Sequence, residues 1–108
     1  MEEVSFEDFK KLDIRIGKII SAEKVKDADK LIKLEIDFGN EKRQIIAGIA
    51  QYYEPENLIG KEVPVIVNLE PKKFKGLESQ GMVLAADNEG MPVLLHPETD
   101  VPAGSIVK

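Results

Sequence analysis

The sequence predicts an all-β fold, a small five-stranded Greek-key barrel with one short helix between its third and fourth strands. Several short stretches alternate apolar and polar residues, which is the period-two pattern of half-buried strands. Turn-forming residues separate these stretches, and only two short segments carry helix signals. A chain of 108 residues suits one domain with a modest core, with roughly residues 10–87 as the barrel and 88–108 as an extension.

The chain starts with a short helix or turn ahead of the first strand. Ser5 is placed to cap it, and Phe6 and Phe9 share a face and are expected to plug one end of the core. Residues 12–20 then alternate as the first strand, in which Gly17 predicts a bend or bulge. One face of this strand is expected to carry Leu12, Ile14, Ile16 and Lys18.

The next two strands form a hairpin. Residues 23–30 are a charged, turn-like connection, and residues 31–38 alternate clearly as the second strand. A tight turn at Gly39 and Asn40 returns the chain into a third strand over residues 43–50. The second strand should point four residues into the core: Ile32, Leu34, Ile36 and Phe38.

The helix and two more strands follow. Pro55 and Gly60 bracket a short helix or turn, at the position where an OB-fold has its helix. The fourth strand covers residues 63–69, and Pro64 within it requires a position that needs no ladder donor. The fifth strand covers residues 82–86. A basic loop joins these two strands and carries Lys72, Lys73 and Lys75.

The residues after the fifth strand exceed what a five-stranded barrel needs. Residues 87–90 predict a turn, and residues 92–95 a short extra strand. The tail then continues through His96 and two prolines to the apolar pair Ile106 and Val107. It packs either on its own barrel or against another chain.

The chain is acidic overall, but its charge is unevenly distributed. A net charge of −5 opposes a generic nucleic-acid binder, whose footprint is a basic patch. Residues 14–44 nevertheless hold eight basic and six acidic side chains, and residues 68–81 hold three and two. Because screening confines each field to about 8 Å at physiological salt, one face can still attract phosphates. The alternative is that the mixed charges only keep the protein soluble.

Composition argues against several other functions. No apolar run approaches the roughly 20 residues of a membrane span, and the acidic N-terminus is unlike a secretory signal, so the cytoplasm is the expected location. Cysteine is absent, and His96 is the only histidine, so no nucleophile–base pair or metal-ligand cluster is evident. We therefore expect no enzyme activity, no catalytic residue, no metal and no cofactor.

The basic loop favours nucleic-acid binding. Its three lysines can contact phosphates, with an affinity that depends on salt but not on sequence. Phe74 among them is either a stacking platform for bases or an anchor of the loop on the core, and we favour the anchor. Because aromatic residues make up 6% of the chain and tryptophan is absent, a folded RNA bound by shape fits better than stacked single strands.

Four stretches carry a family resemblance: Leu12–Ile19, Asp27–Leu31, Arg43–Ala50 and Asn68–Ala86. The last contains the distinctive run Glu78-Ser79-Gln80-Gly81-Met82. The chain resembles the tRNA-binding OB domain family, and within it the beta subunit or C-terminal tRNA-binding domain of methionyl-tRNA synthetase. One departure is that Lys26 and Asp27 stand where many relatives carry His-Pro.

The resemblance implies a non-catalytic module that binds tRNA by its shape and supplies it to a methionyl-tRNA synthetase. It also implies a homodimer formed through residues 88–108. A polar patch with one adaptable methionine joins the lysines of the loop and of neighbouring strands, and Arg15 is a weaker candidate. The expected tRNA-binding residues are Lys30, Lys33, Arg43, Asn68, Lys72, Lys73, Lys75, Ser79, Gln80 and Met82.

Two other functions remain open at this point. One is a protein-interaction or chaperone dimer, since a secretion-related chaperone shares the barrel; that chaperone is expected to be shorter, so the tail after Ala86 favours the synthetase-linked branch. The other is a general binder of single-stranded nucleic acid. The methionine at position 1 suits a separate subunit, and it suits equally a domain of a longer synthetase.

Overall fold

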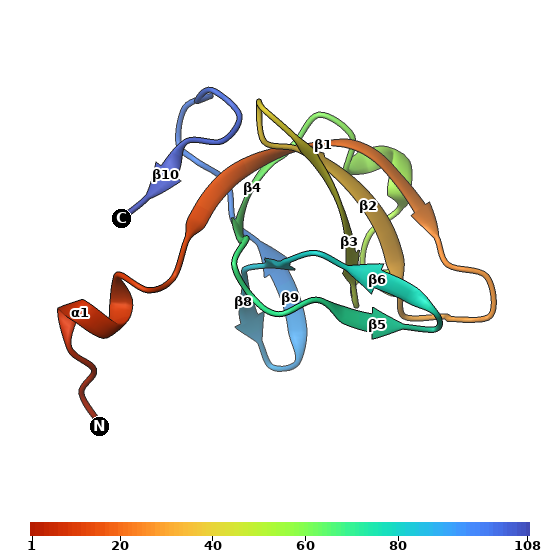
Figure 1. The fold of residues 1–108 in the computed structure, drawn as a ribbon. Coiled ribbons are helices and arrows are strands. Elements are labelled where there is room, and N and C mark those ends of the chain that lie inside the picture. The colour runs from red at the N-terminus through yellow and green to blue at the C-terminus, as the bar shows by residue number, and fades with distance from the viewer.

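The computed structural model describes all residues from 1 to 108, and its main feature is a strongly curled antiparallel sheet (Figure 1). Five strands cross it in the order β3-β2-β1-β4-β7. Their bounds are β1 Ile14–Lys24, β2 Ile32–Asp37, β3 Lys42–Ala47, β4 Glu62–Ile66 and β7 Met82–Val83. A 3-10 helix, η1 (Pro55–Asn57), lies between β3 and β4. The predicted all-β barrel and the position of its short helix are confirmed.

The basic stretch forms a hairpin of its own, where the sequence had predicted a loop. β5 (Lys72–Phe74) pairs with β6 (Leu77–Ser79). Lys75 and Gly76 between them have successive positive φ angles of 51° and 80°, which suit the two-residue turn of a hairpin. The lysines are therefore carried on an ordered arm that leaves the barrel after β4 and returns before β7 (Figure 1).

A second hairpin changes the predicted end of the barrel. The fifth barrel strand, β7, ends at Val83 instead of continuing to Ala86. The next residues pair instead in the hairpin of β8 (Ala85–Asn88) and β9 (Met91–Leu94). The predicted extra strand is therefore present as β9. The predicted turn narrows to Glu89 and Gly90, both with positive φ.

The N-terminal helix stands apart from the core. α1 (Phe6–Phe9) is capped as predicted, with the Ser5 hydroxyl accepting the Asp8 amide at 3.0 Å. Phe6 and Phe9, however, are 70% and 40% exposed, so the prediction that they plug the core is wrong. Figure 1 shows why, because α1 projects away from the barrel and has no element packed over it. Neither α1 nor any other helix has the length and apolar character needed to cross a bilayer.

The barrel core is built mainly from β2 and the strands beside it. All four residues predicted to point inward from the second strand are buried. Gly17 marks no bulge: its missing side chain leaves room for Ile36 and Phe38, whose atoms lie 2.3 and 2.7 Å from where a Cβ would stand. The shift in register falls later, between Ile19 and Ser21. Lys18 is exposed, and Leu12, at 43% exposure, lies ahead of β1.

The C-terminal extension packs on its own barrel. All five residues of β4 are buried, and the Glu62 side chain accepts the amide of Val101 at 2.9 Å. Pro64 lies opposite Ile16, whose N–H and C=O bond instead to Ser105 and Gly104, so no ladder donor is needed there, as predicted. β10 (Ile106–Val107) then pairs with the start of β1.

Candidate nucleic-acid interface

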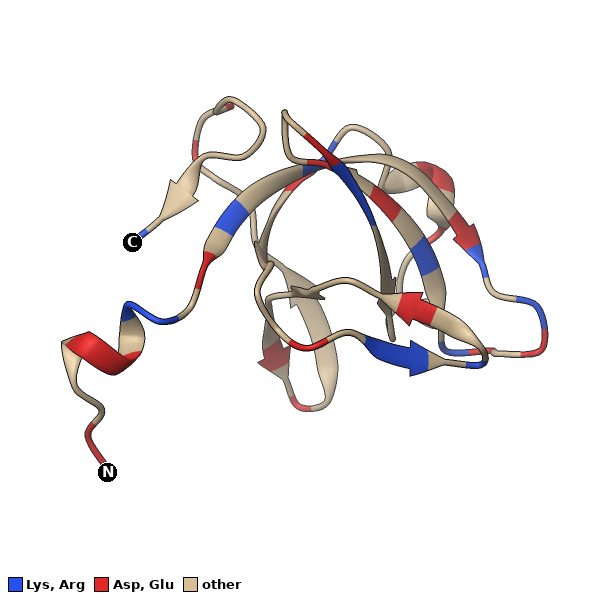
Figure 2. Cartoon of the chain, in the orientation of Figure 1, with Lys and Arg blue, Asp and Glu red and all other residues tan.

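Lysine side chains gather where the β1–β2 loop (residues 25–31) faces the turn of the β5–β6 hairpin. A hollow of about 380 Å³ and an adjoining one of about 360 Å³ lie there, and Lys75 stands in the wall of both. Figure 2 shows basic segments on the hairpin and on this loop approaching each other at one end of the molecule. The lysines of the two hollows are Lys24, Lys26, Lys30, Lys33 and Lys75.

The hollows continue onto the outer face of the sheet. A third hollow, of about 220 Å³, shares Glu23 and Lys33 with the hollow of about 380 Å³. The rest of its wall comes from β1, β2 and β3, including Gln44. We call the three hollows together the groove. It runs from the middle of the sheet past Lys33 to the tip of the hairpin.

The groove is only mildly basic. Its walls carry five lysines and four carboxylates. The Lys33 ammonium lies 2.7 Å from a Glu23 carboxylate oxygen, in a pair whose side chains are 36% and 64% exposed. Such a pair contributes about 0–1 kcal/mol, so an incoming phosphate can replace the carboxylate at little cost.

The two faces of the hairpin differ. Lys72 and Phe74 share one face, and Phe74 lies opposite Leu77, which lines the groove. The Lys72 ammonium is 5.2 Å from the centre of the Phe74 ring, within the range of a cation–π contact. Lys73 points to the other face, opposite Glu78. Phe74 is half-buried, so its role as an anchor stays a prediction.

Ser79 is occupied with the protein's own backbone. Its side chain is buried, at 4% exposure. The hydroxyl accepts the Ile46 amide at 3.0 Å and donates to the Gly81 carbonyl at 3.0 Å. Its only proton is therefore used, and the hydroxyl links β3 to the end of the hairpin.

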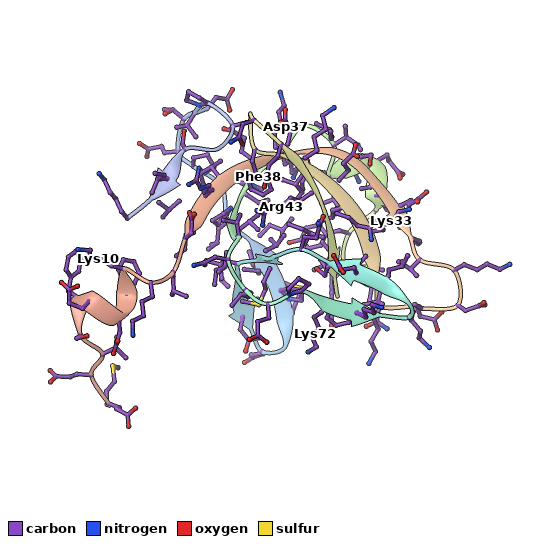
Figure 3. All side chains as sticks on the ribbon, viewed as in Figure 1. Lys10, Lys33, Asp37, Phe38, Arg43 and Lys72 are labelled. Carbon is purple, nitrogen blue, oxygen red and sulfur yellow. The ribbon has the colours of Figure 1, made fainter.

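Arg43 lies inside the curve of the sheet, as Figure 3 shows. Its Nη1 donates to the carbonyls of Val67 and Gln80, and its Nε pairs with Glu41. Val67 directly precedes the hairpin arm and Gln80 is its last residue, so one guanidinium holds both ends of the arm. Arg43 is thus separate from the lysines of the groove.

Asn68 and Gln80 also make internal bonds at the base of the arm. Asn68 accepts the Asp13 amide at 2.8 Å and donates to the Lys11 carbonyl at 2.6 Å. Gln80 exchanges bonds with Gln44: its amide donates to the Gln44 carbonyl at 2.9 Å, and its side-chain oxygen accepts the Gln44 amide at 3.2 Å. The side-chain nitrogen of Gln80 and the 46% exposed Met82 remain available at this base.

Arg15, the weaker candidate, is held outside the groove. Its Nε and Nη2 donate to the two carboxylate oxygens of Asp13 at 2.9 and 3.2 Å. This hydrogen bonding, with the negative charge of Asp13, raises the pKa of Arg15 above its ordinary value. The ion pair therefore holds Arg15, at the start of β1, against Asp13, the residue just before that strand.

The structure brings together part of the predicted set. Lys30, Lys33 and Lys75 share the groove, while Lys72 and Lys73 stand on the adjoining hairpin. The other five lie at the base of the arm: Arg43, Asn68, Ser79, Gln80 and Met82. Sequence reasoning missed Lys24 and Lys26 as groove residues, although both belong to the positive segment 14–44.

The fold and the groove define a small β-barrel module with a lysine-lined groove beside an ordered basic arm. The chain belongs to the family described as putative tRNA binding domain, whose model matches residues 14–106. That match spans the barrel, the arm and almost all of the extension.

Several relatives of this chain are methionine–tRNA ligases. The chain is 59% identical over 106 residues to the ligase of Archaeoglobus fulgidus, covering 98% of this chain and 16% of that protein. It is 54% identical over 101 residues to the ligase of Methanothrix thermoacetophila, covering 94% and 15%. The chain therefore spans about a sixth of the length of these relatives.

Solved structures agree over the full fold. A MetRS-related protein from Pyrococcus horikoshii has a TM-score of 0.95 and 46% identity, with all of both chains covered. The chaperone CsaA of Bacillus anthracis has a TM-score of 0.91 and 40% identity, covering 99% of this chain and all of that one. The expectation that the chaperone is shorter is therefore wrong, and the tail does not separate the two branches.

Proposed function

We propose that this chain is a non-catalytic, structure-specific tRNA-binding module that supplies tRNA to a methionyl-tRNA synthetase. Tethering the module to a catalytic body raises the effective concentration of tRNA there without any chemistry of its own. Membership of the tRNA-binding family and the resemblance to methionine–tRNA ligases support this proposal. The observation that carries it is the convergence of Lys30, Lys33 and Lys75 from three separate segments on one groove.

The lysines of the groove and arm are the proposed phosphate contacts. Lys72 and Lys75 face the groove side of the arm, whereas Lys73 faces away from it beside Glu78. Phosphate contacts of this kind position an RNA without reading its bases, which suits recognition of tRNA by shape. Met82 and the free amide of Gln80 offer an apolar and a polar contact next to the arm.

We propose no catalytic role for Ser79 or His96. The Ser79 hydroxyl donates to a backbone carbonyl and so has no base to activate it. A nitrogen of His96 lies 2.7 Å from the Glu62 carbonyl oxygen on the extension side of the barrel. Neither residue faces the groove.

A homodimer in the cytoplasm is also part of the proposal. The extension exposes several apolar side chains that a second copy would cover: Met91, Val93, Leu95 and Ile106. Sedimentation equilibrium of the purified chain tests this point, with the mass of two chains expected. Introducing a charge by Leu95→Glu should shift the mass toward one chain.

The similarity to the chaperone CsaA favours a second candidate, a protein-interaction module. The two functions differ in what the chain holds when it is recovered from a lysate. A tRNA-binding module brings down RNA, and ribonuclease removes what it carries. A chaperone brings down polypeptide that survives ribonuclease.

Binding of folded and heat-unfolded tRNA at one fixed salt concentration tests the main proposal most directly. A shape-dependent module prefers the folded form, because only that form presents its phosphates in the right arrangement. Unstructured oligonucleotides should compete poorly. Equal competition would instead support a general single-strand binder and would refute structure-specific binding.

A further inference from the structure

The motif that marks this family contains polar residues on the arm, yet their side chains point into the protein. Side-chain hydrogen bonds join the arm, residues 68–80, to β3 and to the residues just before β1. Only the Gln80 amide adds a backbone bond to β3, where it donates to the Gln44 carbonyl. The position of the basic hairpin therefore depends on a few polar side chains.

We propose that Ser79 and Arg43 are positioning residues that fix the basic arm over the groove, and that neither contacts the tRNA. This inference rests on the proposed function of the groove. Ser79 is 4% exposed and its hydroxyl proton is already donated, so it has no proton for an RNA oxygen. Arg43 joins the carbonyls at the two ends of the arm and pairs with Glu41.

We call the bonds by which Ser79 and Arg43 hold the arm the clasp. The arm needs such bonds because the barrel has a gap between β3 and β7. These strands do not pair with each other in the sheet. Because no ladder joins them, the arm is held mainly by side-chain bonds, which also include the Gln44 side chain donating to the Glu78 carbonyl at 2.9 Å. Losing the bonds of Ser79 or Arg43 would loosen the arm relative to the β1–β2 loop. Lys72 and Lys75 would then lose their fixed spacing from Lys30 and Lys33, and fewer phosphates would be met at once.

The test is a comparison of Ser79→Ala with the double variant Lys72→Gln/Lys75→Gln, and of all three changes together. We measure affinity for folded tRNA between 50 and 200 mM salt. If Ser79 acts through the lysines, Ser79→Ala lowers affinity about tenfold at 100 mM and reduces the slope of log affinity against log salt by about 1. In the Lys72→Gln/Lys75→Gln background the same change then alters affinity by less than about twofold.

Arg43→Lys supplies a second variant in case Ser79→Ala fails to fold. It keeps the positive charge but loses the planar fork that reaches two carbonyls. Its matched control is Arg15→Lys, because Arg15 shares the same small hollow as Arg43 but bonds only to Asp13. Ser105→Ala is the control for hydroxyl loss, since that hydroxyl donates to Pro102 in the extension.

Hydrogen exchange in the free protein gives a readout that needs no RNA. The Gln80 amide bonds to the Gln44 carbonyl and so reports whether the base of the arm opens. We expect it to exchange faster in Ser79→Ala and in Arg43→Lys than in either control. Unchanged protection of Gln80 in both variants overturns the clasp.

The failures of the two proposals are distinguishable. If Ser79→Ala weakens binding by the same factor in the Lys72→Gln/Lys75→Gln background, Ser79 contacts the RNA itself and the positioning role is wrong, while the groove proposal stands. If the double lysine variant binds like the unaltered chain, the groove proposal fails and the clasp falls with it. Loss of the Ser79 effect in that background supports both.

Discussion

Replacing Lys72 and Lys75 together by glutamine should weaken tRNA binding in a way that depends on salt. Lys75 lines the groove, and Lys72 lies on the hairpin face that Leu77 shares. Glutamine removes each positive charge but leaves a polar, unbranched side chain of somewhat shorter length. Each phosphate contact contributes about −0.9 to the slope of log affinity against log salt. Losing two contacts should therefore reduce the magnitude of the slope by about 1.8.

The same slope gives the loss of affinity. If one phosphate contact adds little to the affinity at 1 M salt, it raises the affinity about eightfold at 100 mM, since ten raised to the power 0.9 is about eight. Two contacts then contribute about 60-fold at 100 mM, and about 20-fold at 200 mM. The predicted loss thus shrinks by about threefold over a range that fluorescence anisotropy with labelled tRNA covers easily.

The controls follow from the placement of the other lysines. Lys73→Gln removes the same charge from the other face of the hairpin, beside Glu78, and should change the slope by less than half as much as Lys75→Gln. Lys61 lies between η1 and β4, outside the groove. Lys61→Gln should therefore leave both the affinity and the salt slope equal, within experimental error, to those of the unaltered chain. An unchanged slope in the double variant would refute the assignment of the groove as the phosphate-binding surface.

Three further predictions concern stability, each measured by urea denaturation of the isolated chain. Gly104→Ala should lower the free energy of unfolding by about 1–3 kcal/mol or more, because φ is +92° and a Cβ would stand 2.2 Å from the Phe38 carbonyl oxygen. Gly90→Ala is its control and should lower it less, because φ is also positive, at +90°, but the space around it is open. Leu58→Ala should cost about 2–5 kcal/mol, since that side chain is fully buried in the core cluster. Tyr53→Phe should cost about 1–3 kcal/mol and speed exchange of the Leu94 amide, because the lost hydroxyl accepts that amide and donates to the Pro92 carbonyl, both at 3.2 Å.

The barrel strands could be predicted because their pattern is local. Residues 32–38 alternate strictly, and a strand with one buried face has no other register that hides its apolar side chains. The basic hairpin could not be predicted in this way, because its turn is Lys75-Gly76 and not one of the Asn-Gly or Asp-Gly pairs that mark such turns. Phe6 and Phe9 misled for another reason: their spacing identifies a shared face, but not whether anything covers it.

For the candidate site, too, one part could be predicted from the sequence and another could not. Gathering of lysines was predictable, because the positive segments of the sequence are also the segments that carry the motifs. What the polar residues do was not predictable, since their partners are distant in the chain. Ser79 bonds to Ile46, and Asn68 to Lys11, across separations of 33 and 57 residues. Only a structure shows that these side chains are already occupied.

The net charge of −5 does not conflict with a phosphate-binding groove, because distance and screening decide which charges a phosphate meets. The molecule extends 41 Å along its longest axis, whereas the screening length at physiological salt is about 8 Å. Figure 2 shows the acidic α1 at the opposite end of the molecule from the β1–β2 loop. A phosphate near Lys75 therefore responds to the lysines and to the few carboxylates of the groove. The carboxylates that matter are Glu23 and its neighbours in the groove wall, so neutralising Glu23 should strengthen RNA binding while neutralising Glu7 of α1 should not.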